Sequence, residues 1–454
     1  MNINVTDGLS GNSACTSYLA DMPLGNSRNA MATIELTGKC NLSCPFCTHP
    51  AKSEAHKSLK AIQREIATIV ALSQCDTIVL AGGEPLLHPE LEAAVKMVIS
   101  ANRKPILLTN GILLTRERLT ALKAAGLFGI MFHVNAMQNR PGWENCAEVE
   151  LNSLRLTLAE LANEFGLHCG FNTLVFPDTL ADVQRVALWA SSVSDKVHMM
   201  TFVATRVFEA TISRDEDGEM SGEGRGSIFL SPYHDEPEGD HVTRMLSTHD
   251  IYDQIQKVFP GYRFNSFLGS TAQSGVLKWA MGTHLCRTGK HLGNLGPTAV
   301  ALIEALCRKI SGRDISHLSP GVARQGWLVL LTGLFDRDAR RTIWRHWVSA
   351  IRKPLELFRT LHLQTFVVMQ SFDILPGKEG INCNGCSRKT TKKPDRFHQG
   401  THNRGYVLGS ISSIDALPED STQMQWPKQS PSLWRNSELE RIGREDLQLN
   451  KIKN

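Results

Sequence analysis

Three cysteines lie within eight positions near the start of the chain, in the segment GKCNLSCPFC. Cys40, Cys44 and Cys47 are separated by three and then two residues, so their thiolates can converge on one metal centre. A structural zinc site usually has four protein ligands, whereas an iron–sulfur cluster held by three cysteines leaves one iron open to a small molecule. The spacing alone leaves both metals open, because both accept thiolates.

Short apolar runs alternate with helical patterns from residue 31 onward. We predict strands within 31–37, 77–85, 105–111, 127–134, 167–176 and 197–204, with helices within 58–73, 88–101, 115–126, 147–166 and 181–193 between them. Each crossover helix returns the chain in the same direction, so the six strands are expected to be parallel. Six units are fewer than the eight of a closed barrel. The predicted fold class is therefore α/β, a partial (β/α)6 barrel of parallel strands with a mostly helical C-terminal domain.

The rest of the chain differs in composition from this barrel. We predict an N-terminal extension at 1–30, a core domain at 31–206, an acidic Gly/Ser-rich loop at 207–227, the mostly helical domain at 228–394 and a polar tail at 395–454. A net charge of +4 over 454 residues favours no particular partner. The N-terminus lacks the features of a secretory signal, and eleven cysteines indicate metal or redox chemistry more than disulfides, so we expect a cytoplasmic protein.

Two further motifs follow predicted strands on the same face as the cysteine loop. The segment GGEP (82–85) ends the second strand, and TNG (109–111) ends the third. Paired glycines let backbone approach a ligand closely, and Glu84 can accept hydrogen bonds from an ammonium group. Each motif taken alone is also compatible with an ordinary turn.

Together, CNLSCPFC, AGGEPLLHPEL and LLTNG in successive β/α units resemble the radical S-adenosylmethionine (SAM) superfamily, in particular its molybdenum-cofactor-biosynthesis-like branch. The resemblance covers about residues 30–206. It implies that Cys40, Cys44 and Cys47 hold a [4Fe–4S] cluster, whose open iron is chelated by SAM. The cofactor-binding residues implied are Phe46, Gly82, Gly83, Glu84, Thr109 and Asn172. The implied activity is reductive cleavage of SAM followed by hydrogen abstraction from a substrate.

The segment after the fourth strand departs from the pattern of the resembled family. Relatives often carry Ser-(Leu/Ile)-Asp-Gly there, whereas this chain has HVNA (133–136) within the polar stretch FHVNAMQNRPGW. We predict substrate contacts among four side chains of this stretch because catalytic residues concentrate on this barrel face. These candidates are His133, Asn135, Gln138 and Arg140. The alternative is a loop whose polar groups bond one another.

A second group of metal-binding side chains occurs near the C-terminus. The pairs Cys-x2-Cys and His-x3-His are spaced much as in a zinc finger; they comprise Cys383, Cys386, His398 and His402. Cys286 and Cys307 are possible additional ligands, although Cys307 lies on an apolar helical face and is expected in the core. Zinc, an auxiliary Fe–S cluster and no metal all remain open.

The stretch 337–353 is predicted to be an amphipathic helix bearing two tryptophans and many arginines. Such a helix can lie on an anionic membrane surface. We favour the commoner arrangement, in which the apolar face packs on the protein and the basic face is solvated.

The sequence thus supports a radical SAM enzyme acting on a metabolite or modified peptide. Its expected partners are SAM, an organic substrate and an electron donor such as flavodoxin or ferredoxin, with no nucleic acid. A radical SAM enzyme acting on lipid at the membrane surface is one alternative, with peripheral membrane contact. A non-catalytic, zinc-stabilised binding protein is the other.

Overall fold

The structure is a computed structural model that describes residues 30–44, 55–205, 231–232, 246–270, 277–287, 290–313, 332–352, 361–370, 373–374 and 381–382. All of the described residues belong to one compact unit. The predicted loop at 207–227, the tail at 395–454 and the extension at 1–29 lie outside the described residues.

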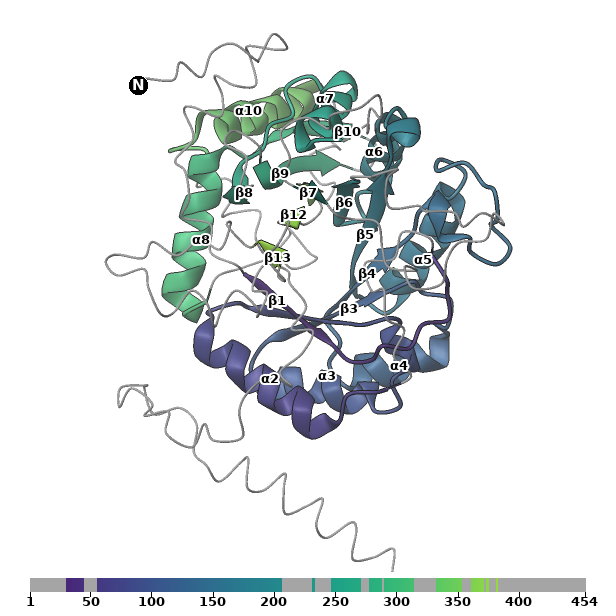
Figure 1. Ribbon diagram of the computed structural model, residues 1–454. Helices are drawn as coiled ribbons and strands as arrows, with labels where there is room; N and C mark the ends of the chain where they lie inside the picture. The colour runs from purple at the N-terminus through teal and green to yellow at the C-terminus, as the bar shows by residue number, and fades with distance from the viewer. Residues whose placement is uncertain are drawn as a thin grey trace, which may run out of the picture. The chain divides into compact units, whose positions relative to one another are not determined.

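Six parallel strands form the first part of one curved sheet and follow each other in chain order (Figure 1). They are β1 (Met31–Glu35), β2 (Thr77–Ala81), β3 (Lys104–Thr109), β4 (Gly129–His133), β5 (His168–Val175) and β6 (Met199–Ala204). Each strand pairs in parallel with the next. The predicted partial (β/α)6 barrel is confirmed.

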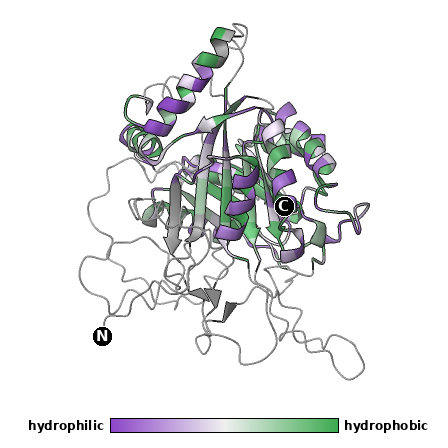
Figure 2. Cartoon of the chain, turned by 90° about the horizontal axis from the view of Figure 1, so that it is seen from above, coloured by the Kyte–Doolittle hydropathy of each residue, from purple (hydrophilic) through white to green (hydrophobic). Residues whose placement is uncertain are grey.

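Five helices connect these strands and cover the outer face of the sheet (Figure 1). They are α2 (Leu59–Leu72), α3 (Leu91–Ser100), α4 (Arg116–Ala124), α5 (Asn152–Glu164) and α6 (Asp182–Ser192). The hydroxyl groups of Ser58 and Thr115 cap α2 and α4 by accepting backbone N–H groups. Figure 2 shows mostly hydrophobic strands flanked by helices that are hydrophobic on one side and hydrophilic on the other.

The two faces of the sheet differ in how they are filled. Phe132 and Phe171 face the helices: Phe132 lies near Gly111 and Phe171 contacts the ring of Trp189 on α6. Side chains alternate along a strand, so Met131 and its row point to the inner face. That face carries a smaller apolar cluster made of Val79, Ile106, Met131, Met199 and Val367, with Met31, Leu108, Phe128, Met281 and Met369 partly buried against it.

The region predicted to be a mostly helical domain instead extends the same sheet. Strand β11 (His362–Gln370) pairs in parallel with β6, and β9 (Leu277–Arg287) pairs antiparallel with β11. Strands β8 (Ser266–Ser270) and β10 (Lys290–Asn294) flank β9, while α7 (Thr248–Val258), α8 (Pro297–Ser311) and α10 (Arg337–Arg352) pack around them. The sequence did not predict these strands, because β11 pairs with β6 and β9, partners that are distant from it in sequence.

Strand β11 is tied into the first part of the fold by a buried side chain. The Gln364 amide donates to Ala190 O (2.8 Å) and to Val197 O (2.7 Å), across 174 and 167 residues of sequence. A small second sheet contains β7 (Ser231–Pro232), β12 (Asp373–Ile374) and β13 (Ile381–Asn382). Among the described residues, no helix is both long and apolar enough to cross a bilayer.

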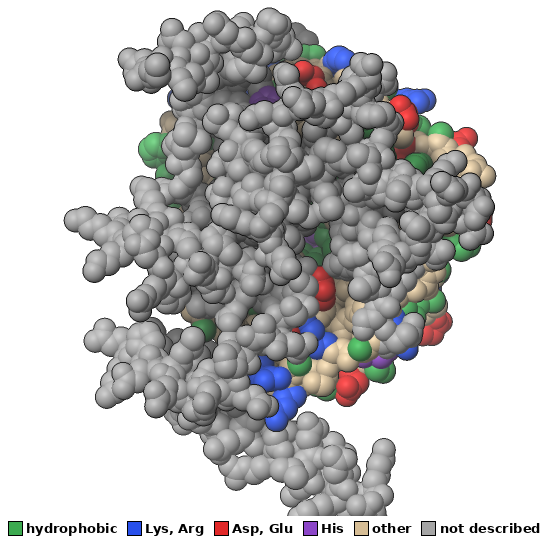
Figure 3. Space-filling model, in the orientation of Figure 1, with side chains coloured by type: hydrophobic (Ala, Val, Ile, Leu, Met, Phe, Trp, Pro, Cys, Tyr) green, Lys and Arg blue, Asp and Glu red, His purple; other side chains and the backbone are tan. Residues whose placement is uncertain are grey.

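The described surface carries charges of both signs. In Figure 3, Lys and Arg side chains lie next to Asp and Glu along the lower and right-hand rim. This mixture agrees with the small net charge of the chain.

Candidate active site

The cysteine loop leaves the sheet at the end of β1, and its two ends are held together. Thr37 forms an isolated bridge with His56, and Gly38 N–H donates to Ala55 O (3.2 Å). Lys57 N–H then donates to Leu36 O (2.8 Å), while the His88 ring donates to Lys57 O (2.9 Å). Both ends of the cysteine loop are therefore fixed to the sheet.

Two of the three predicted cluster ligands are described. Cys40 and Cys44 are half-buried thiols outside any disulfide, and Cys40 Sγ accepts the N–H of Leu42 (3.4 Å). Cys47 and Phe46 lie outside the described residues. Reduced, half-buried thiols in a loop at the carboxyl ends of parallel strands are a suitable donor set for an iron–sulfur cluster.

The glycine pair after β2 packs directly against the start of the cysteine loop. Gly83 N–H donates to Thr37 O and Glu84 N–H to Lys39 O, both at 2.7 Å. A Cβ added at Gly83 would lie 2.7 Å from the carbonyl carbon of Lys39 and 2.8 Å from Gly38 O. The glycines are required here because any side chain would occupy the space of the cysteine loop's backbone.

The Glu84 carboxylate is fully buried and joins the ends of β2 and β3. Its Oε1 accepts from Thr109 Oγ1 (2.6 Å) and Leu86 N (3.0 Å), and its Oε2 accepts from Asn110 N (2.8 Å). Burial raises the pKa of Glu84, while these hydrogen bonds and the charge of Arg140 act in the opposite direction. The hydroxyl group of Thr109, which was predicted to contact SAM, thus donates its hydrogen to Glu84.

Asn110 connects this network to the cysteine loop; it belongs to the TNG motif but was not among the predicted cofactor-binding residues. Its side-chain amide donates to Asn41 Oδ1 (2.7 Å), and its carbonyl accepts from Arg140 Nη2 (2.6 Å). Burial lowers the pKa of Arg140, and the negative charges of Cys44 and Glu84 oppose that shift. The signal for Asn110 in the sequence was its place in the TNG motif at the end of the third predicted strand.

The polar loop after β4 is held by a buried ion pair. Arg155 on α5 pairs with Glu148 and donates to Val134 O (2.9 Å), while Ala136 N–H donates to Glu148 Oε2 (2.7 Å). Arg155 is fully buried. Sequence reasoning missed this pair because nothing in the pattern of either residue indicates that it lies in the core.

The structure separates the four predicted substrate contacts into two groups. Asn135 and Gln138 are buried and form a capping box around the turn Ala136–Gln138. Arg140 is buried as well, and its Nη2 donates to three oxygen atoms. These three side chains build the loop in which they lie, although Arg140 Nη1 has no hydrogen bond among the described residues.

His133 and Asn172 are the candidate side chains at the inner edge of the site that make the fewest hydrogen bonds among the described residues. They lie opposite each other on β4 and β5, and Asn172 lies opposite Thr201 on β6, so all three share the inner face. Among the described residues, the ring of His133 makes one hydrogen bond, between Nε2 and the Asn135 amide (2.8 Å). Burial and the charges of Arg140 and Arg155 lower the pKa of His133 to about 4, so its ring is neutral at pH 7.

The remaining cysteine predictions fall in two places. Cys286 is buried on β9, where its thiol donates to His362 O (3.3 Å) and burial raises its pKa to about 12. Cys307 packs against an apolar cluster on α8, as expected. Cys383, Cys386, His398 and His402 lie outside the described residues. Within the described part of the chain, no group of three or more His, Cys, Asp or Glu residues could hold a metal ion.

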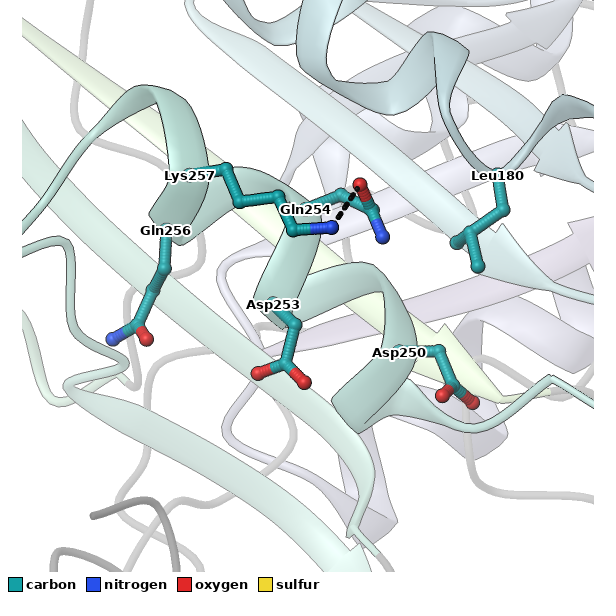
Figure 4. A pocket seen from close by; sticks show the side chains of 6 residues that line it. All are labelled: Leu180, Asp250, Asp253, Gln254, Gln256 and Lys257. Atoms are coloured by element: carbon teal, nitrogen blue, oxygen red, sulfur yellow. Dashed lines mark hydrogen bonds between the residues drawn. The ribbon is translucent and has the colours of Figure 1, made fainter. Parts of the chain in front are cut away.

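A surface pocket of about 360 Å³ lies between α7 and the turn before α6 (Figure 4). Its lining consists of Leu180, Asp250, Asp253, Gln254, Gln256 and Lys257. Lys257 donates to Gln254 within it (3.1 Å). None of these residues comes from the ends of β1–β4, so the pocket is not part of the cysteine-loop site.

Comparison with known proteins gives a consistent match over the first part of the chain. Residues 34–190 match the family model described as Radical SAM superfamily. The chain is 40% identical over 110 residues to GTP 3',8-cyclase of Synechococcus sp. (strain CC9902), which is 23% of this chain and 30% of that protein. It is 35% identical over 99 residues to PqqA peptide cyclase of Gluconobacter oxydans (strain 621H), which is 20% of this chain and 26% of that protein. These matches span less than a third of either relative.

Among solved structures, the chain is similar to SuiB of Streptococcus suis bound to S-adenosylmethionine. The identity is 14% and the TM-score 0.36, over 51% of this chain and 47% of that one.

Proposed function

We propose that this chain, whose residues 34–190 match the radical SAM superfamily and which is similar there to GTP 3',8-cyclase and PqqA peptide cyclase, is an enzyme that abstracts hydrogen from an organic substrate. We place the cluster on Cys40, Cys44 and Cys47. When bound, a [4Fe–4S] cluster supplies the electron that cleaves the sulfonium of SAM. The observation that carries the proposal is a cysteine loop anchored at the carboxyl ends of parallel strands and braced by Gly82–Gly83–Glu84.

The brace also limits how SAM can be held. The N–H groups of Gly83 and Glu84 already donate to the cysteine loop. An ammonium group has only hydrogens to donate, so the amino group of SAM must be met by backbone carbonyls of Gly82 and Gly83 or by Glu84. Asn172, whose side chain makes no hydrogen bond among the described residues, is suited to the remaining SAM contacts.

A metabolite or modified peptide is the substrate class that the inner face supports. Beneath the rim, the inner face carries an apolar cluster that includes five methionines, which adapt to irregular organic shapes. One named relative acts on GTP and another on a peptide. We favour a substrate whose reacting part is an organic group over one bound by its phosphates, because Lys104, the cation that lies over the Phe128 ring of this cluster, already pairs with Asp76 (2.7 Å). The enzyme would work in the cytoplasm with a flavodoxin or ferredoxin as electron donor.

The decisive test is anaerobic incubation of the reduced, iron-loaded protein with SAM, followed by mass spectrometry for 5′-deoxyadenosine. Cys44→Ala should lose both iron and this product. Cys146→Ala is the matched control, because Cys146 is also half-buried but lies outside the cysteine loop. Equal product from wild type and Cys44→Ala would defeat the cluster assignment. Zinc in place of iron and sulfide would support the zinc-stabilised binding protein instead.

The difference between Asn172, which is suited to contact SAM, and Asn135, which builds its own loop, gives a second test. Asn172→Ala should weaken SAM binding while changing the melting temperature little, since its half-buried side chain makes no hydrogen bond among the described residues. Asn135→Ala should destabilise the protein by about 1 kcal/mol, because it removes a cap. An Asn172→Ala variant that binds SAM normally would contradict the role given to it.

A further inference from the structure

The amphipathic helix α10 has its two tryptophans and Ile351 on the outside. Trp344 is 68% exposed, Trp347 48% and Ile351 77%, and in the turn just before the helix Leu334 and Phe335 are 68% and 69% exposed. Figure 1 places α10 at the edge of the fold beyond β10, on the side opposite α2–α4. The favoured prediction, in which this apolar face packs on the protein, is therefore wrong for Trp344, Trp347 and Ile351, whereas Ile343 and Val348 are half-buried.

The physical reason is that a different stripe of α10 is used for packing. Ala339, Thr342 and His346, at three- and four-residue spacing, are the buried residues of the helix. Thr342 Oγ1 donates to Asn294 O on β10 (2.9 Å), and His346 Nδ1 accepts from Arg287 Nη2 on β9 (2.9 Å). These specific polar contacts fix the rotation of the helix, so its tryptophans must face outward.

Basic side chains accompany the outward apolar residues. The first half of the exposed face carries Arg337, Arg340, Arg341 and Arg345, all of them exposed. The single acidic residue of the helix is Asp338, which lies 3.9 Å from Arg341 and 4.0 Å from Arg263. Such long contacts at an exposed position leave the arginines available to another anion.

We propose that the outward face of α10, with Leu334 and Phe335, docks on the anionic headgroup region of a lipid bilayer. Tryptophan favours the level of the headgroups, exposed aliphatic side chains enter the acyl boundary, and arginines pair with lipid phosphates. All three kinds of group are satisfied together at this interface. This docking does not depend on the proposed chemistry.

Other occupants match the face less well. A nucleic acid would pair with the arginines but would leave Leu334 and Ile351 in water, since phosphates do not cover aliphatic groups. A symmetric second copy would bring the same patch of arginines against itself, and like charges repel. The combination of charge and apolar surface therefore selects a membrane.

The test is sedimentation of the full-length protein with vesicles of phosphatidylcholine, with or without phosphatidylglycerol. Wild type should bind only the anionic vesicles. Trp344→Ser with Trp347→Ser should reduce binding at least about tenfold, and Arg340→Gln with Arg341→Gln by about fivefold per arginine. The matched control is Arg185→Gln with Leu188→Ser. It removes an exposed arginine and an exposed apolar residue from α6 and leaves α10 unchanged.

All four exposed positions can be changed without disturbing the core, so the melting temperatures should agree within a few degrees. Failure of the wild type to bind anionic vesicles would overturn the proposal. So would equal binding by wild type and the tryptophan variant, or loss of binding in the α6 control. Self-association or RNA binding through α10 without vesicle binding would likewise replace the membrane with another occupant.

Discussion

Replacing Gly83 by alanine should detach the cysteine loop from the sheet. The backbone of Gly83 is not in the left-handed region, so alanine can adopt its conformation and the only obstacle is space. The added methyl group would lie 2.7 Å from the carbonyl carbon of Lys39, well inside van der Waals contact. Because the obstructing atoms are backbone atoms, no side-chain rotation can relieve the clash.

The cost can be worked out from the contacts that must break. Moving the loop away removes the bonds Gly83 N–H to Thr37 O and Glu84 N–H to Lys39 O. At about 0.5–1.5 kcal/mol each, the loss is about 1–3 kcal/mol. Because the loop can yield locally, the global melting temperature should fall by only a few degrees, whereas the cysteines lose their fixed positions.

The assay is iron and sulfide content after anaerobic reconstitution, measured beside the thermal unfolding curve. Gly83→Ala should lose most of its iron. Gly142→Ala is the control: Gly142 has a φ of +78° and no atom within 4 Å of an added Cβ, so alanine there costs about 1–2 kcal/mol of backbone strain without a clash. A Gly83→Ala protein with full iron content would refute the reasoning.

Three further perturbations test the supporting contacts. Thr109→Val removes the hydroxyl bonded to the buried Glu84 carboxylate and should destabilise the protein by about 1–3 kcal/mol in urea unfolding. Glu148→Gln leaves the charge of Arg155 buried and uncompensated, which should cost about 3–5 kcal/mol. Burial lowers the pKa of His284 to about 3. As the pH falls from about 6.5, the unfolded chain therefore binds a proton at this residue before the folded chain does, and the free energy of unfolding should drop by about 3 kcal/mol by pH 4. His284→Gln should flatten that pH dependence.

Controls for these experiments come from the same chain. Thr157→Val removes a hydroxyl that donates to Ser153 O of the same helix at an exposed position, and it should change stability by less than about 0.5 kcal/mol. Equal effects of Thr157→Val and Thr109→Val would contradict the account of Glu84. A Glu148→Gln protein as stable as wild type would show that the ion pair is replaceable. If the stability of His284→Gln depended on pH as steeply as that of wild type, groups other than His284 would cause the loss of stability in acid.

The sequence predicted those features that depend on local pattern. Alternating apolar runs indicated six parallel strands in order, and the position of Cys40 just after the first strand placed the loop at the carboxyl edge. Strand β11 could not be foreseen, because its partner β6 lies far away in sequence and the pairing is settled by packing. Likewise, periodicity identified α10 as amphipathic but could not say that Ala339, Thr342 and His346 would be its inner face.

The candidate site shows the same division. The motifs located Glu84 and Thr109 correctly at adjoining strand ends, since both follow predicted strands. Sequence could not show that their side chains bond each other, nor that Asn135 and Gln138 bond within their own loop. Hydrogen-bond partners depend on distances of tenths of an ångström, which no spacing of residues records.

The insertion of β11 beside β6 has a consequence for how this protein can be shortened. A fragment ending at residue 206, the boundary suggested by the sequence, would expose the edge of Met199–Ala204, a run of six residues without a charge or proline. Such a bare edge invites pairing with another molecule. Fragments that keep residues 361–370 should stay monodisperse, while shorter ones should precipitate.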